Sequence, residues 1–496
     1  MVRIKHEHDL ETLRQIALLV DDENRRLVDE NVRLRVELAR ARGIPDTEQL
    51  RLSILESLQK KREHIFRIDE RRERKSSNGA KSPGHGPREQ PQLPVIDKVI
   101  ELAENERRCS VCDGELGEMS GQFEESEVVT VVKRSFVIEK QLRKKYRCRC
   151  NANVVTAPGP DKLIPGGRYS VEFAAEVAVN KYVDHLPLER QVRMMKREDL
   201  SIDSQTLWDQ LYALSRHVEP TYEALKQRAL SSPVVHADET GWPLLDKKKR
   251  KSESRGSVWT LSTPEVVVYR MMPSKSEEDG RKLLGSYTGT VVADGYVVYE
   301  NLSRAGPYRL VNCWAHVKRH ADELQENFPS AASELLGLIR ELYQVEREVG
   351  GPFPGDEEAQ KRRLRLRQER SRPITMQIHA WLFAQQGLPR SDLGKLVRYV
   401  LERWKALTVF LEDPLVPLDN NPAERSLRSP VLGRKNHFGS RSHRGTHVAE
   451  LLYSLCETAR LHRLDPRDYL VAAAKRTIRQ PGAVTMPEDV AAATVA

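Results

Sequence analysis

Two short β-branched runs, each leading to an aspartate, restrict the fold of this chain most. Val234 and Val235 lead through two residues to Asp238, and residues 291–293 lead directly to Asp294. Short apolar runs rich in β-branched residues predict buried strands. We therefore expect each aspartate at the end of a strand, where its carboxylate leaves the sheet.

A third acidic residue, Glu424, follows the turn-forming sequence Asp-Asn-Asn-Pro. Pro422 is tolerated in the first turn of a helix, which predicts that Glu424 lies on one. Two nearby acids are expected to have other roles. Glu239 should point to the opposite side of its strand from Asp238, and Asp419 should cap the turn before the helix of Glu424. A single aspartate after a strand is most often a turn residue, so the argument depends on all three together.

Two strand-borne aspartates followed by a helix-borne glutamate are the pattern of RNase H-like polynucleotidyl transferases. The chain also carries C-x-x-C and C-x-C pairs, a C-W-A-H sequence, and D-N-N-P-A-E-R before a basic tract. With these motifs it resembles, over nearly its whole length, a bacterial DDE transposase of the insertion-sequence-sixty-six (IS66) family. The resemblance implies a multidomain α+β protein with an RNase H-like α/β core, and catalytic roles for Asp238, Asp294 and Glu424.

Phosphodiester chemistry at such a site uses two divalent ions about 3.5–4 Å apart. Hard oxygen ligands with room for water and phosphate suit Mg²⁺. The resemblance implies that Asp238 bridges two Mg²⁺ ions, while Asp294 and Glu424 each hold one of them.

Four of the six cysteines are spaced as metal ligands: Cys109, Cys112, Cys148 and Cys150. Two such knuckles separated by a hairpin supply the tetrahedron of a structural Zn²⁺ site. A redox pair is less favoured, because no thioredoxin-like βαβ pattern surrounds the cysteines. In the family this region binds zinc and contacts DNA. The basic cluster beside the second knuckle supports such contacts: Lys140, Arg143, Lys144, Lys145, Arg147 and Arg149.

A further candidate pair of side chains, Cys313 and His316, belongs to the C-W-A-H sequence. Two ligands alone make a poor zinc site. We expect a structural or substrate-positioning role near the active site, and an ordinary core cysteine and histidine is the alternative.

Leucine and valine recur every seven residues at Leu13, Val20, Leu27 and Leu34. The heptad predicts a coiled coil, and Asn24 and Asn31 at the intervening core positions favour a parallel dimer. We therefore expect a homodimer or higher oligomer. An amphipathic helix packed on its own protein is the alternative.

Changes of composition divide the chain. The predicted parts are a coiled-coil and basic helical region (1–75), a flexible linker poor in apolar residues (76–94), a zinc-binding domain (95–160), a helical region (161–231), the first part of the core (232–320), an α-helical insertion (321–415) and the last part of the core with the basic C-terminal region (416–496).

The helical region contains two helices separated by a break near 200–203. Ser204 is the expected N-cap of the second helix. A helix-turn-helix that enters a major groove and an ordinary helical hairpin both fit this pattern.

After Glu424 the chain is basic, with no further acid up to residue 444. Such one-sided charge favours phosphate contacts over a solvated loop. The basic residues are Arg425, Arg428, Arg434, Lys435, Arg441 and Arg444.

The formal net charge of +9 over 496 residues agrees with a nucleic-acid partner. A run of about 18 apolar residues is missing, so we expect no membrane span, and the first residues lack the apolar core of a signal peptide. We expect a cytoplasmic bacterial protein, associated with the nucleoid when it acts.

The predicted function is DNA transposition: binding of terminal inverted repeats, nicking that frees a 3′-OH, and attack of that hydroxyl on target DNA. Accessory proteins of the element are further expected partners. A non-catalytic DNA-binding regulator derived from a transposase is the alternative, and a metal-dependent nuclease without strand transfer is a third hypothesis.

Overall fold

The structure is a computed structural model that describes residues 135–147, 153–244, 255–351, 354–385, 390–440 and 442–495, together with six isolated positions before residue 117. The predicted coiled coil, the linker, the four zinc cysteines, Arg149 and Arg441 lie outside these residues. The chain divides into two units, Met1–Glu127 and Val128–Ala496. Every helix and strand with defined bounds belongs to the second unit.

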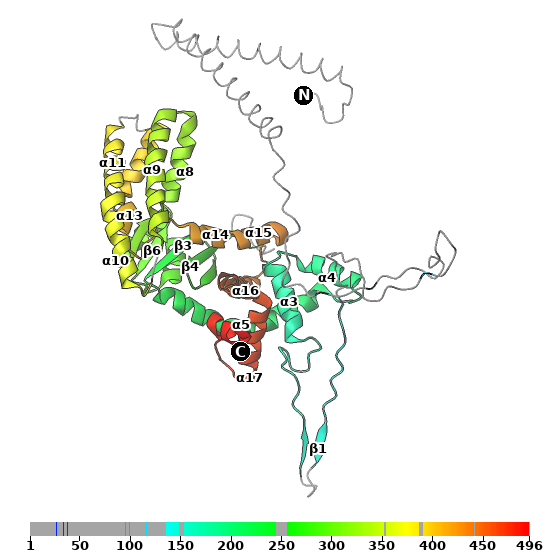
Figure 1. The fold of residues 1–496 in the computed structure, drawn as a ribbon. Coiled ribbons are helices and arrows are strands. Elements are labelled where there is room, and N and C mark those ends of the chain that lie inside the picture. The colour runs from blue at the N-terminus through cyan, green and yellow to red at the C-terminus, as the bar shows by residue number, and fades with distance from the viewer. Residues whose placement is uncertain are drawn as a thin grey trace. The chain divides into compact units, whose positions relative to one another are not determined.

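The centre of this unit is a five-stranded mixed sheet in the order β5-β4-β3-β6-β7 (Figure 1). The first three strands in sequence pair antiparallel, and β6 and β7 continue the sheet in parallel with β3. The strands are β3 (Val234–Pro243), β4 (Arg255–Ser262), β5 (Val267–Met272), β6 (Thr290–Ala293) and β7 (Arg309–Asn312).

Strand β3 changes partners along its length, and this corrects one prediction. Its parallel pairing with β6 runs only from Val234 to His236, whereas its antiparallel pairing with β4 runs from His236 to Pro243. The prediction that Asp238 ends a strand is therefore wrong, because the hairpin partner β4 extends β3 beyond the aspartate. The parallel pairing of β3 with β6 ends at His236, two residues before Asp238.

Helix α16 (His443–Leu461) covers the outer edge of β5. Three side chains on successive turns, Glu450, Ser454 and Thr458, accept hydrogen bonds from the outward backbone N–H groups of β5. An open sheet edge is a template for unwanted pairing, and α16 prevents this by supplying acceptors for the free N–H groups of β5. Around α16 pack α3 (Val171–Tyr182), α5 (Ser204–Ser231) and α17 (Pro466–Arg479), followed by α18 (Pro487–Val495).

The helical region contains α3, α4 (Leu188–Arg197) and α5. The N-cap of α5 is one residue earlier than predicted. Asp203 accepts the Thr206 N–H at 2.6 Å, while the Ser204 hydroxyl donates to Glu189 of α4. The Ser204 prediction is wrong because the aspartate beside it takes the capping bond, and Ser204 ties the two helices together.

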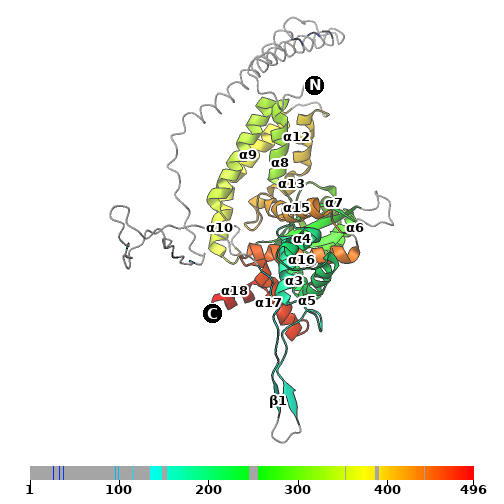
Figure 2. The same cartoon turned by 90° about the vertical axis from the view of Figure 1, so that its right-hand side faces the viewer.

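Two helices connect strands along the chain. Helix α6 (Glu277–Leu284) follows β5, α7 (Val297–Ala305) follows β6, and the two helices pack on each other. After β7 a second helical group follows, and Figures 1 and 2 show α8 and α9 side by side within it. Its helices are α8 (Trp314–Glu323), α9 (Pro329–Val349), α10 (Glu357–Leu366), α11 (Arg372–Ala384), α12 (Asp392–Glu402) and α13 (Trp404–Thr408).

A buried arginine fastens this helical group to the chain that returns to the sheet. Arg367 is fully buried, pairs with Glu346 of α9 at 2.7 Å, and donates to the carbonyls of Phe410, Asp413 and Val416. The return segment then leads into α14 (Asn421–Ser426) and α15 (Arg428–His437). Among the described helices, none combines the length and apolar character that a membrane crossing requires.

Candidate active site

The register of the parallel strands brings Asp238 and Asp294 together. The last parallel pair joins His236 of β3 to Val292 of β6, and each aspartate lies two residues beyond its member of that pair. Two residues along a strand return to the same face, and neighbouring strands are about 4.8 Å apart. The two carboxylates therefore emerge side by side at the end of the parallel half of the sheet.

The side chain of Asn420 brings Glu424 to the same place. Its Nδ2 donates to the carbonyl of Ala237 at 2.8 Å, and its Oδ1 lies 3.1 Å from Nδ1 of His236. Asn420 is fully buried, and its contact with Ala237 lies immediately before Asp238. Glu424 follows one helical turn later on α14, where Pro422 lies in the first turn as predicted.

His236 supports this docking as a neutral side chain. Burial lowers its pKa to about 4. Because the Asn420 amide nitrogen is engaged with Ala237, the Asn420 oxygen must accept from His236, which puts the imidazole proton on Nδ1. The buried pair is therefore satisfied without a charge.

The carboxyl of Asp238 is strongly perturbed by its surroundings. Burial first, and then the negative charges of Asp294, Glu239 and Glu424, raise its pKa to about 7, while the Glu239 N–H at 2.8 Å acts in the opposite direction. A buried carboxylate among like charges favours a proton or a cation. Among the described residues, no positively charged side chain forms an ion pair with Asp238 to offset these negative charges.

Glu239 lies in a separate environment. Its carboxylate is 3.3 Å from Lys275 Nζ and accepts the Tyr299 hydroxyl at 2.9 Å. Burial and then Asp294 raise its pKa, and Lys275 lowers it. Both oxygens are therefore occupied, in keeping with the interpretation of Glu239 as outside the triad.

Two further acids are held by the backbone. Asp294 accepts the Tyr296 N–H at 2.9 Å, and Asn312 of β7 donates to the Asp294 carbonyl. Asp419 accepts the Asn421 N–H at 3.1 Å, so the prediction that it caps the turn before α14 is confirmed. Burial raises the pKa of Asp419.

Glu424 has one engaged and one free oxygen. Oε2 lies 3.3 Å from Nη2 of Arg319. Oε1 lies 3.7 Å from Nδ1 of His316, and both of these atoms are buried and without a hydrogen-bond partner in the described part of the chain. The ligand atoms of Cys313, His316 and Glu424 all lie within 4.8 Å of one another. Cys313 and His316 are therefore at the candidate site.

The donor set fits divalent cations. Asp238, Asp294 and Glu424 supply hard oxygen ligands. Burial and acidic neighbours disfavour the ionised form of Asp238, and Glu424 Oε1 is a buried acceptor without a donor among the described residues. Mg²⁺ prefers such ligands and retains several waters.

The basic residues after Glu424 have two different roles. Arg425, Arg428 and Lys435 are exposed, and with exposed Leu432 they follow one another at intervals of three or four residues, so they form one stripe along α14 and α15. Arg434 instead donates to Thr240 and to the Gly241 carbonyl of β3. Its guanidinium therefore binds α15 to the sheet through Nη1, and the prediction of a phosphate contact at Arg434 stays a prediction.

The other predicted contacts lie on a two-stranded ribbon formed by β1 (Lys145–Arg147) and β2 (Val154–Thr156). Arg143, Lys144 and Lys145 are exposed there. Arg143 Nε donates to the Ala157 carbonyl, so it also braces the ribbon. Before the ribbon, Phe136 packs edge-on against Phe173 of α3.

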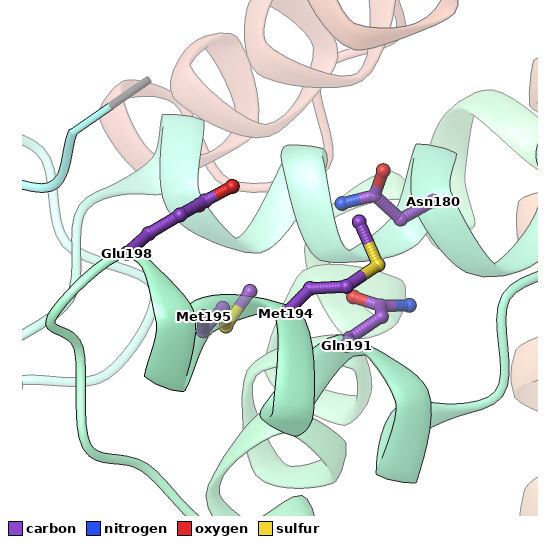
Figure 3. A pocket seen from close by; sticks show the side chains of 5 residues that line it. All are labelled: Asn180, Gln191, Met194, Met195 and Glu198. Carbon is purple, nitrogen blue, oxygen red and sulfur yellow. The ribbon is translucent and has the colours of Figure 1, made fainter. Parts of the chain in front are cut away.

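A small depression between α3 and α4 holds none of the three carboxylates. Figure 3 shows its lining side chains, Asn180, Gln191, Met194, Met195 and Glu198. Gln191 donates there to the carbonyls of Val177 and Leu186. This lining joins helices and supplies no cluster of catalytic groups.

Sequence reasoning missed Asn420, His236, Arg319 and Lys275 as parts of the site. A signal for Asn420 was present, because it precedes the predicted helix of Glu424 in D-N-N-P. His236 and Lys275 carried no local signal, since their roles depend on contacts across the sheet.

Comparison with known proteins agrees with these features. The model of the family "Transposase IS66 family" matches residues 166–448, which contain the sheet and all three carboxylates. Two proteins of Sinorhizobium fredii are similar: uncharacterized protein y4jD is 30% identical over 404 residues (78% of this chain and 77% of the relative), and uncharacterized protein y4hP is 26% identical over 414 residues (78% and 73%). The chain belongs to the IS66 transposase family.

The raised pKa of Asp238 predicts a pH-dependent stability change in Asp238→Asn. The native state disfavours the ionised carboxylate, so the wild-type protein loses stability as pH rises from the ordinary value of 3.8 to about 7. Asparagine removes this loss. In EDTA at pH 8, the free energy of unfolding of Asp238→Asn, measured by denaturant titration, should exceed that of wild type by on the order of 1–4 kcal/mol, and the gain should shrink at pH 5. A gain of equal size at both pH values would contradict the assignment.

Proposed function

We propose that the protein is a DDE transposase that binds the terminal inverted repeats of its element, cleaves a DNA strand there and joins the freed 3′-OH to target DNA. Membership of the IS66 transposase family supports this activity. The observation that carries the proposal is the meeting of Asp238, Asp294 and Glu424 at one end of the parallel strands.

The sheet supports an RNase H-like assignment of the core. Three antiparallel strands followed by two parallel ones, in the order β5-β4-β3-β6-β7, agree with the strand and helix succession expected of that fold. The first aspartate on the central strand and the second after its parallel neighbour agree with the expected positions. The long helical group between β7 and α14 corresponds to the proposed insertion.

Two Mg²⁺ ions would be held by Asp238 between them and by Asp294 and Glu424 on either side, and would supply activation of the attacking oxygen and stabilisation of the leaving oxygen. The chain's own residues prepare the place. Asn420 fixes α14 on β3, the Tyr296 N–H orients Asp294, and Arg319 holds one oxygen of Glu424.

DNA contacts are proposed for the stripe of Arg425, Arg428 and Lys435, which begins directly beside Glu424. Among the described residues, no carboxylate pairs with these three cations, so they can neutralise phosphates and release counterions. Arg143, Lys144 and Lys145 on the ribbon are proposed as a second contact.

The remaining proposals concern residues outside the described ranges. A structural Zn²⁺ held by Cys109, Cys112, Cys148 and Cys150 would stabilise a DNA-contacting domain. The N-terminal heptads would join two or more copies, which would suit the pairing of two transposon ends, and accessory proteins of the element are further proposed partners.

The alternative is a DNA-binding regulator with an inactive core. An inactive core has no use for like charges buried together, whereas Asp238 here is buried beside acidic neighbours, and burial and these neighbours raise its pKa. A nuclease without strand transfer shares the same site, and it differs only in the fate of the 3′-OH.

Cleavage of a labelled duplex carrying the element's end tests the proposal. The wild-type protein should nick it with Mg²⁺ or Mn²⁺, and Asp294→Ala and Glu424→Ala should lower the rate by roughly 100-fold or more, because even groups that only support metal ligands are worth about 10–100-fold. End binding should persist in both. Glu412→Ala, an exposed acid elsewhere, is the control. Binding without nicking by the wild type, in the presence of any accessory proteins that the element encodes, would favour the regulator.

The basic stripe gives a second prediction. Arg428→Ala should weaken binding to DNA of any sequence and reduce the slope of log affinity against log salt by about 0.9. Arg460→Ala should leave the slope unchanged, since Arg460 is already paired with Glu457. Salt titrations monitored by fluorescence anisotropy measure both. An unchanged slope in Arg428→Ala would remove that residue from the DNA-binding surface.

A further inference from the structure

We propose that His316 is a ligand of the divalent ion at Glu424, so that this half of the metal site has a nitrogen donor and binds Mn²⁺ in preference to Mg²⁺. The inference rests on the proposed function, because it assigns one more residue to the same site. It concerns which divalent ion the site prefers, a question that the three carboxylates alone do not answer.

The contact between His316 and Glu424 is incomplete without a ligand. Nδ1 of His316 and Oε1 of Glu424 face each other at 3.7 Å, too far for a hydrogen bond. Both atoms are buried, and neither has a partner among the residues that the structure describes. A buried polar atom without a partner is costly, so two such atoms directed at each other indicate a missing shared partner.

The separation suits a shared metal ion. Two ligand atoms at about 2.1 Å from one ion, at an angle of roughly 90–120°, are about 3–3.6 Å apart. The observed 3.7 Å requires only a small approach of the two side chains. No larger rearrangement is needed.

The backbone holds both ligands in place. Cys313 is the N-cap of α8, and His316 lies in the first turn of that helix. The Trp314 N–H donates to the Leu418 carbonyl, directly before the D-N-N-P sequence that leads to α14. The helix of His316 and the helix of Glu424 are thus joined at their starts, and the two donors are preorganised.

Cys313 is excluded from the ligand set. A soft sulfur ligand suits neither Mg²⁺ nor Mn²⁺, and the Cys313 Sγ accepts the buried backbone N–H of Asn420 at 3.1 Å, a contact that belongs to the docking of α14. Arg319 contacts only Oε2 of Glu424 and leaves Oε1 available. The ligand pair at this position is therefore His316 and Glu424.

Nitrogen ligation changes the metal preference. Mg²⁺ holds its oxygen ligands and waters most strictly, whereas first-row transition ions accept imidazole, with Mn²⁺ the weakest binder of that series. A nitrogen donor therefore disfavours Mg²⁺ relative to Mn²⁺. A rival role, in which His316 contacts the DNA phosphate, would leave metal affinity unaltered. The two roles therefore differ in a measurement that needs neither DNA nor turnover.

Titration of the full-length protein with Mn²⁺, followed by electron paramagnetic resonance, separates these roles. His316→Ala should weaken the tightest Mn²⁺ site by about tenfold or more and remove the coupling between the Mn²⁺ electron spin and a histidine nitrogen. His320→Ala, on the same helix with its imidazole beside Glu323, is the matched control and should retain both. His316→Asp should restore binding and shift the preference toward Mg²⁺.

The outcomes distinguish this inference from the proposed function. If wild type binds Mn²⁺, Asp238→Ala loses it and His316→Ala keeps both affinity and nitrogen coupling, His316 is not a ligand and the carboxylate site stands. If wild type binds no Mn²⁺ at all, the proposed metal-dependent function fails together with the inference. Unchanged circular dichroism of each variant shows that a loss is not due to unfolding.

Discussion

The buried carboxamide of Asn420 joins segments 184 residues apart in the chain. It donates to the Ala237 carbonyl and accepts from His236, and the backbone N–H of Asn420 donates to Cys313. These bonds connect the central strand, the start of α8 and the start of α14. They fix the start of α14, and so the position of Glu424 relative to the two aspartates, while Ser426 at the other end of α14 contacts Thr260 of β4 and Tyr269 of β5.

The docking creates an electrostatic conflict that suits a cation site. Three carboxylates approach one another at the end of the parallel strands, and burial together with Asp294 raises the pKa of Asp238 to about 7. The protein neutralises the neighbouring Glu239 with Lys275 but leaves the triad with one partial partner, Arg319. The buried carboxylates thus lower the stability of the metal-free protein, and bound divalent ions would raise it. Such a cost in stability is common at functional sites.

Local sequence predicted much of the sheet, and long-range contacts account for the errors. The β-branched runs correctly predicted the start of β3 and β6, because buried parallel strands are recognisable from composition. The end of β3 was misplaced, since its antiparallel partner β4 comes later in the chain and extends it past Asp238. The bond of Arg434 to Gly241 was not foreseen, because it has no local signature. The roles of His236 and Asn420 were hidden for the same reason.

The central claim is that Asn420 assembles the site, and Mn²⁺ binding by Asn420→Ala tests it most directly. All three carboxylates remain in this variant, so any loss of metal reflects their placement. We predict that Mn²⁺ affinity falls by about tenfold or more, whereas Asn436→Ala, which removes an asparagine whose side chain bonds only within its own helix, binds like wild type. Wild-type affinity in a folded Asn420→Ala protein would contradict the account.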